Sequence, residues 1–245
     1  MNYNWNWGIF WQPSPDGAGT YLDTLLAGLN WTLATALTAW VLALVLGAIV
    51  GTLRTAPIKW LAGLATAYVE LFRNIPLLVQ MVLWFFVVPE LLPTEAGKWI
   101  KTLPNASFWT AVVSLAFFTS ARVAEQVRAG IQSLPRGQAQ AATALGLTVP
   151  QTYRYVLLPM AFRIILPPLT SEFLNIIKNS AVALTIGLME LTASTRAMQE
   201  FSFQVFEAFT AATIIYLAIN AVVVLGMRGV ERWVAVPGYI GGRTR

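Results

Sequence analysis

Long apolar segments are the feature of this sequence that most limits its fold. Residues 31–53 contain no charged side chain. At about 1.5 Å of rise per residue, a helix of that length exceeds the roughly 30 Å thickness of the hydrocarbon layer of a bilayer. Four further apolar runs follow, at residues 60–92, 108–127, 160–177 and 205–227. We therefore predict an all-α membrane protein with five transmembrane helices.

Composition agrees with a membrane protein and excludes several chemistries. Hydrophobic residues make up 57% of the 245 residues and charged residues only 11%. The chain has no cysteine and no histidine, which excludes disulfides, thiolate metal sites and histidine-dependent catalytic triads. The net charge of +5 comes from basic residues spread between the apolar runs, a pattern typical of membrane loops rather than of nucleic-acid binding.

The basic residues favour one side of the predicted membrane domain. One side carries Arg54, Lys59, Arg128, Arg136, Arg154, Arg163, Arg228, Arg232, Arg243 and Arg245, and the other carries Lys98, Lys101 and Arg196. Positive loops stay in the cytoplasm, so we expect the N-terminus outside and the C-terminus inside. Residues 1–30, rich in tryptophan, then form an outer interfacial segment, residues 31–228 the transmembrane domain and residues 229–245 a cytoplasmic tail.

A polar stretch, residues 125–159, interrupts the apolar pattern on the cytoplasmic side. Residues 138–145 are rich in alanine and glutamine and favour helix, and Gly146 suits the left-handed position that ends a helix. Thr148 then begins a second helix with Gln151 as its capping-box partner. We expect a pair of short helices within residues 137–158, with Gly137 and Gly146 as hinges.

Charged groups at membrane depth mark two further places. Glu70 and Arg73 are three residues apart and are expected to pair, and Pro76 breaks the second apolar run shortly afterwards. Such a break lines a watery cavity or forms a structural kink, and both interpretations stay open. Arg122 and Glu125 share the same spacing, which favours a structural ion pair.

The second place is a polar stripe near the end of the fourth apolar run. It comprises Ser171, Glu172, Asn175, Lys178, Asn179 and Ser180. A charge facing lipid costs about 2.5 kcal/mol or more near the bilayer centre, so the stripe is expected to face the bundle interior. Snorkelling of Lys178 to the interface is the alternative. We expect Pro167-Pro168 to break this span, and Gly47 and Gly51 to form a helix-packing face or a dimer seam.

The central polar stretch resembles the EAA loop of binding-protein-dependent ABC importer permeases. The family pattern is Glu-Ala-Ala, three residues, Gly, nine residues, Ile, any residue, Leu-Pro. The match rests on Ala141-Ala142, Gly146 and Leu158-Pro159, whereas Gln140 replaces the glutamate and Val156 the isoleucine. The resemblance implies contact with an ATPase through Gly137, Gln138, Gln140, Ala141, Ala142, Gly146, Leu158 and Pro159.

Residues 68–80 and 178–181 are similar to markers of the polar amino acid subfamily. The likeness to glutamate/aspartate import permeases extends through residues 5–10, 122–128, 131–138, 168–172 and 237–242. An acidic substrate needs fixed positive charge, so we expect a substrate-binding cavity lined by Arg73, Asn74, Lys178, Asn179 and Ser180. Glutamine and asparagine stay open as substrates.

The resemblance also implies partners and a location. It implies a type I ABC importer permease fold in the bacterial inner membrane, without a cofactor in this chain. The implied partners are a second homologous permease in a heterodimer, two ATPases that use ATP and Mg, and a periplasmic amino acid binding protein.

Two other function classes account for part of the pattern. An ATP-independent channel keeps the polar stripe but gives the short helix pair no role. An intramembrane enzyme without histidine or cysteine requires a Ser-Lys or a paired-Asp site. Both aspartates, Asp16 and Asp23, lie outside the predicted spans, so Lys178 with Ser180 or Ser171 is the candidate.

Overall fold

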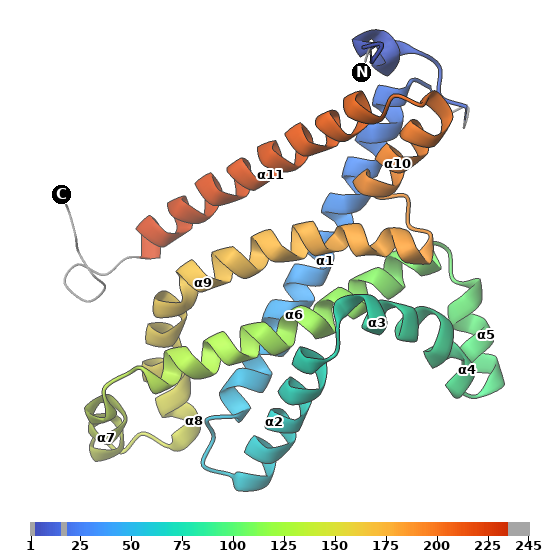
Figure 1. Ribbon diagram of the computed structural model, residues 1–245. Coiled ribbons are helices and arrows are strands. Elements are labelled where there is room, and N and C mark those ends of the chain that lie inside the picture. Colours follow the sequence, from blue (N-terminus) through green and yellow to red (C-terminus); the bar gives the residue numbers. More distant parts are fainter. Residues whose placement is uncertain (1–2, 16–18, 235–245) are drawn as a thin grey trace. The chain divides into compact units, whose positions relative to one another are not determined.

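The computed structural model describes residues 3–15 and 19–234, and these residues fold into helices, turns and one isolated bridge between Pro13 and Thr20. Four helical stretches are long and apolar enough to cross a membrane. They are α1 (Tyr21–Leu53), α6 (Ala106–Gln132), the stretch Val149–Ile186 that contains α9 (Leu158–Asn179), and α11 (Val205–Val234) (Figure 1). The all-α prediction is confirmed for this part of the chain.

A fifth candidate span is broken into two parts. Ile75 and Pro76 separate helix α2 (Lys59–Asn74) from α3 (Leu77–Val82), and Lys59–Asn74 meets the criteria for a span only together with Leu77–Leu91. Pro76 has extended ψ, with φ −57° and ψ 140°, and it lacks an N–H group for the helical ladder. The predicted break at Pro76 is confirmed.

Shorter elements connect these helices. In chain order they are η1 (Trp7–Trp11), η2 (Leu83–Val87), α4 (Val88–Leu91), α5 (Thr94–Thr102), α7 (Arg136–Ala144), α8 (Val149–Thr152), η3 (Tyr153–Leu157), η4 (Ser180–Ile186) and α10 (Leu191–Ser202). The sequence anchor at residues 237–242 and the tail arginines Arg243 and Arg245 lie outside the described residues.

The chain forms two compact units, and most of the long helices contribute to both. The first unit comprises Met1–Val41, Ile75–Ala116 and Asn175–Ala221, and the second comprises Leu42–Asn74, Phe117–Leu174 and Val222–Arg245.

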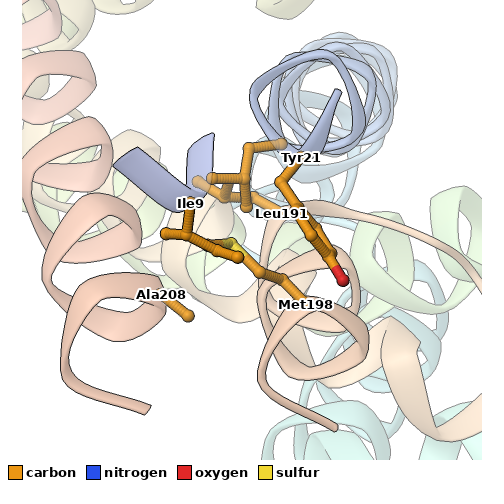
Figure 2. Close-up of a cluster of buried hydrophobic side chains, with 6 residues drawn as sticks. Ile9, Tyr21, Leu191, Met198 and Ala208 are labelled. Carbon is orange, nitrogen blue, oxygen red and sulfur yellow. The ribbon is translucent and has the colours of Figure 1, made fainter. Parts of the chain in front are cut away.

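In the first unit, the N-terminal segment packs against α1, α10 and α11. Figure 2 shows the apolar cluster that joins them, and its buried members are Ile9, Tyr21, Leu25, Leu191, Met198 and Ala208. Since these side chains come from four elements that are distant in sequence, the cluster fixes η1 and α10 beside the ends of the two long helices.

Two fully buried carboxylates reinforce this cluster. Glu190 caps the N-terminus of α10 by accepting hydrogen bonds from the backbone N–H groups of Thr192 (2.9 Å) and Ala193 (2.8 Å). Glu207, in the first turn of α11, accepts from the Tyr3 hydroxyl (2.5 Å) and the Asn6 N–H (2.7 Å). The hydrogen bonds offset the large cost of burying charge.

In the second unit, glycines allow α1 to lie directly against α6. A methyl group added to Gly51 would lie 2.5 Å from the Ala124 carbonyl oxygen, and one added to Gly47 would lie 2.5 Å from Val123 Cβ. The two glycines therefore form a helix-packing face within this chain, which was one of the two predicted roles.

Helix α1 begins at Tyr21, before the predicted start of the first span at Trp31, and the apolar cluster around Tyr21 and Leu25 packs its first turns. One predicted break is wrong. Pro167-Pro168 does not break α9, which continues to Asn179. Two prolines remove only two backbone donors, and helices in membranes tolerate them where neighbouring turns continue.

The glycine contact predicts the result of adding one methyl group. Gly51→Ala should lower the free energy of unfolding by about 1–3 kcal/mol, because the close approach of α1 and α6 leaves no space for it. Thermal unfolding in detergent measures the effect. Gly63→Ala on α2, where nothing lies within 4 Å of the added methyl, is the matched control and should be neutral or slightly stabilising, since alanine favours helix. Equal stability of the two variants would contradict the packing argument.

Candidate functional site

The short helix α7 ends in a hydrogen-bonded turn that requires a residue with a left-handed backbone conformation. Gly146 has φ +80°, and its N–H donates to the Thr143 carbonyl (2.9 Å), while the Leu147 N–H donates to the Ala142 carbonyl (3.1 Å). These two bonds define a Schellman motif. The predicted helix end at Gly146 is confirmed, whereas Gly137 is the second residue of α7 rather than a break before it.

Helix α8 begins with the predicted capping box. The Thr148 N–H donates to Gln151 Oε1 at 2.8 Å, and Pro150 occupies the first turn. The π-helical turn η3 follows, and the Tyr153 hydroxyl donates to the Thr55 carbonyl at 2.6 Å. This hydrogen bond joins η3 to the loop that follows α1 in the same unit (Figure 1). It therefore fixes the position of the turn through which α8 continues into α9.

The surface of this helix pair carries exposed apolar side chains. Leu145 is 82% exposed, Tyr155 62% and Val149 53%, whereas Ala142 is buried. Gln140 and Ala141 are also exposed, and Gln138 and Leu158 are half-buried. A group of exposed apolar residues on a short polar segment is typical of a surface that binds another protein.

An ion-pair cluster lies in the same unit, near the end of α1. Glu125 on α6 pairs with Arg54, which follows α1, and with Arg128 on its own helix. The predicted Arg122–Glu125 pair is wrong: the Arg122 guanidinium lies over the Phe118 ring, 4.5 Å from its centroid. Arg54 is nearly buried, with a side chain 10% exposed, and therefore needs the carboxylate.

Arg73 and Asn74 end α2 in the second unit, and both are exposed. The Asn74 amide donates to Glu70 Oε2 at 3.2 Å. The predicted Glu70–Arg73 ion pair does not form, and no carboxylate in the described residues pairs with Arg73. The guanidinium is thus available to an anion.

The other candidate residues lie in the first unit, where α9 passes into η4. Lys178 is exposed, and no described carboxylate forms an ion pair with it. Asn179 is half-buried. Ser180 is fully buried, and its hydroxyl donates to the Ile177 carbonyl at 2.7 Å. The serine hydroxyl therefore shapes the end of α9, and the lysine is the exposed charge beside it.

Sequence reasoning missed the two buried carboxylates of the first unit. The Glu190 carboxylate also lies 3.2 Å from the Tyr216 hydroxyl and 3.4 Å from the Thr32 hydroxyl, both of which donate to it. Burial raises the pKa of the Glu190 carboxyl. Its place immediately before α10 was a usable signal, since acidic residues favour helix N-termini.

A comparison with protein families supplies the context for this geometry. Residues 23–236 match the model of the family described as binding-protein-dependent transport system inner membrane component. The chain belongs to this family. It is accordingly a permease component rather than the ATPase, and the short helix pair occupies the position of the family's EAA loop.

Two curated relatives are similar over most of their length. The chain is 51% identical to the glutamate/aspartate import permease protein GltJ of Escherichia coli strain K12, over 99% of this chain and 100% of the relative. It is 33% identical to the probable glutamine ABC transporter permease protein GlnM of Bacillus subtilis, over 89% of this chain and 94% of the relative.

Solved structures confirm the fold. The crystal structure of an amino acid ABC transporter with histidines matches with a TM-score of 0.73 and 31% identity, over 87% of this chain and 95% of that chain. An inward-facing structure of the MetNI methionine ABC transporter matches with a TM-score of 0.74 at 21% identity, over 87% and 97%. The chain therefore has the fold of the permease component of an ABC importer.

The ion-pair cluster generates a stability prediction. Glu125→Gln should lower the free energy of unfolding by about 1–3 kcal/mol, less than for a fully buried pair, because it leaves the nearly buried Arg54 without a counter-charge. Thermal unfolding in detergent measures the change. Glu200→Gln breaks an exposed pair with Arg196 and should be almost neutral, so an equal loss in both variants would refute the role of burial.

Proposed function

We propose that this chain is one half of the transmembrane pathway of an ATP-driven importer of glutamate and aspartate. The observation that carries the proposal is the 51% identity to the glutamate/aspartate permease, which covers the whole of that relative. Identity to the probable glutamine permease is far lower. An acidic substrate also accounts for Arg73 and Lys178, two exposed cations without a described carboxylate partner.

The membrane arrangement follows from the charge distribution. We propose five spans in the inner membrane, with α2 and α3 as halves of the second span, the N-terminus in the periplasm and the C-terminus in the cytoplasm. The basic residues of the α7–α9 region and of the end of α11 support this orientation. A second homologous permease completes the pathway, two ATPases bind at the cytoplasmic face with ATP and Mg, and a periplasmic protein delivers the amino acid.

In the proposed pathway, the substrate contacts come from charged and polar side chains at the ends of helices. The break after Asn74 exposes the end of α2, where the Arg73 fork suits a carboxylate. Lys178 offers a point charge, Asn179 offers amide hydrogen bonds, and Ser180 holds the end of α9 that presents them. A dicarboxylate offers a second anionic group that an amide lacks, so cationic residues such as these favour glutamate and aspartate over their amides.

Coupling to ATP hydrolysis is proposed to act through α7. The helix moves as a rigid body with the ATPase, because its end is fixed by the Schellman turn and the exposed apolar residues that follow it suit a groove in a partner. Ala142 is the buried residue of α7, and the motion is proposed to pass from α7 through α8 to Leu158 and Pro159, where α9 begins. Gln140, Ala141 and Gln138 lie on the same short helix and complete the contact.

The substrate proposal predicts a charge-specific defect. Arg73→Gln and Lys178→Gln should each raise KM for glutamate about 10- to 100-fold, the loss of one charge-assisted hydrogen bond of roughly 1.5–3 kcal/mol. Uptake in proteoliposomes with the binding protein and ATPases measures it. Lys98→Gln, an exposed lysine of α5, is the control and should leave KM unchanged. Wild-type uptake of glutamine as fast as that of glutamate would refute the substrate assignment.

The coupling proposal predicts a separate defect at Gly146. Gly146→Val should leave the protein in the membrane but uncouple ATP hydrolysis from uptake, because a β-branched residue does not accept φ +80°. Gly146→Asn is the matched control at the same position and should retain coupling, since asparagine tolerates the left-handed region. The ratio of uptake to ATP hydrolysis is measured. Normal coupling in the valine variant would contradict the role of the Schellman turn.

A further inference from the structure

A cavity near the end of α11 brings three arginines together in the second unit. Its volume is about 280 Å³, and it is lined by Arg163 of α9 and by Arg228 and Arg232 of α11. Arg228 and Arg232 are four residues apart and share one face of α11, and Arg163 approaches from the other helix. Leu166 and Pro167 supply an apolar wall.

The three guanidinium groups have little to neutralise them. No carboxylate of residues 3–15 and 19–234 forms an ion pair with any of them. The one carboxylate lining the cavity, Glu231, accepts a hydrogen bond from the Thr170 hydroxyl at 3.1 Å. Arg163 has a contact of 3.8 Å to the Met160 sulfur, which is a weak acceptor. The cavity keeps an excess of positive charge beside an apolar surface.

Simpler reasons account for some of these arginines but not for their convergence. Basic residues in the last turn of a helix complement the helix dipole, which suits Arg232. Arg228 lies before the last turn, and Arg163 lies inside the continuous helical stretch Val149–Ile186, so the dipole favours neither of them. A cavity that collects all three, with an apolar wall, fits a ligand that joins an anion to hydrocarbon.

The depth of the cavity identifies the source of that ligand. Helix α11 has 30 residues, which at about 1.5 Å per residue exceeds the roughly 30 Å hydrocarbon layer. The apolar run of this helix ends at Met227 and Arg228 follows it directly, so we place the last turns of α11 in the headgroup layer. Basic pockets between membrane helices at this level are suited to phospholipid headgroups, and arginine binds phosphate oxygens in pairs.

We propose that Arg163, Arg228 and Arg232 bind the phosphate ester of an anionic phospholipid, with an acyl chain against Leu166 and Pro167. A soluble phosphate ester shares the headgroup chemistry, but it makes no use of the apolar wall. The site itself is independent of the transport proposal.

The test titrates phosphatidylglycerol into the delipidated, purified importer and follows bound lipid by native mass spectrometry. Phosphatidylglycerol should bind selectively over phosphatidylcholine of the same acyl chains. In Arg228→Gln/Arg232→Gln its apparent affinity should fall about thirtyfold, the loss for two basic residues at an anionic surface. Arg228→Lys/Arg232→Lys keeps the charge and should lose less. Lys59→Gln/Arg154→Gln removes two other basic residues of the same unit and should bind like the wild type.

Three results would overturn the proposal. These are equal binding of the two lipids, unchanged binding in the Arg228→Gln/Arg232→Gln variant, and an equal loss in the Lys59→Gln/Arg154→Gln control. Glycerol 3-phosphate that competes as well as phosphatidylglycerol would overturn the assignment to lipid. Because uptake is not the readout, failure of the substrate proposal leaves this result unaffected.

Discussion

A bilayer offers no hydrogen-bond partners to the peptide backbone, and this constraint determines where the chain may depart from helix. Within each described span, the backbone N–H and C=O groups form hydrogen bonds with one another along the helix. Where α2 stops at Asn74, the Gln80 amide donates to the Ile75 carbonyl at 3.0 Å and so satisfies a group that the ladder has lost. Irregular backbone at membrane depth thus occurs where side chains of the chain itself replace the missing bonds.

The sequence predicts the features that depend on residues close together in the chain, and it does not predict those that depend on distant residues. Helix ends set by local chemistry follow from short patterns, as the Schellman turn at Gly146 and the capping box of Thr148 and Gln151 illustrate. Apolar runs likewise predict the spans. Neither pattern depends on where another helix lies, so neither needs tertiary information.

Ion pairs and buried carboxylates were less predictable because they depend on tertiary neighbours. The spacing of Arg122 and Glu125 suggests a pair, yet Arg54 approaches from the end of another helix and takes the carboxylate. Glu207 is an ordinary acidic residue in a first turn until the N-terminal segment covers it. The candidate substrate residues share this difficulty, because their residue types are readable from the sequence but their tertiary neighbours are not.

The hydrogen bonds between the N-terminal segment and Glu207 of α11 have a practical consequence for work on the purified protein. Tyr3 and Asn6 satisfy the carboxylate of Glu207, which is wholly buried. A substitution of Tyr3, or a shift of the backbone at Asn6, removes a donor from this carboxylate and leaves it partly unsatisfied beside the apolar cluster. Variants designed for handling in detergent therefore need to keep both residues in place.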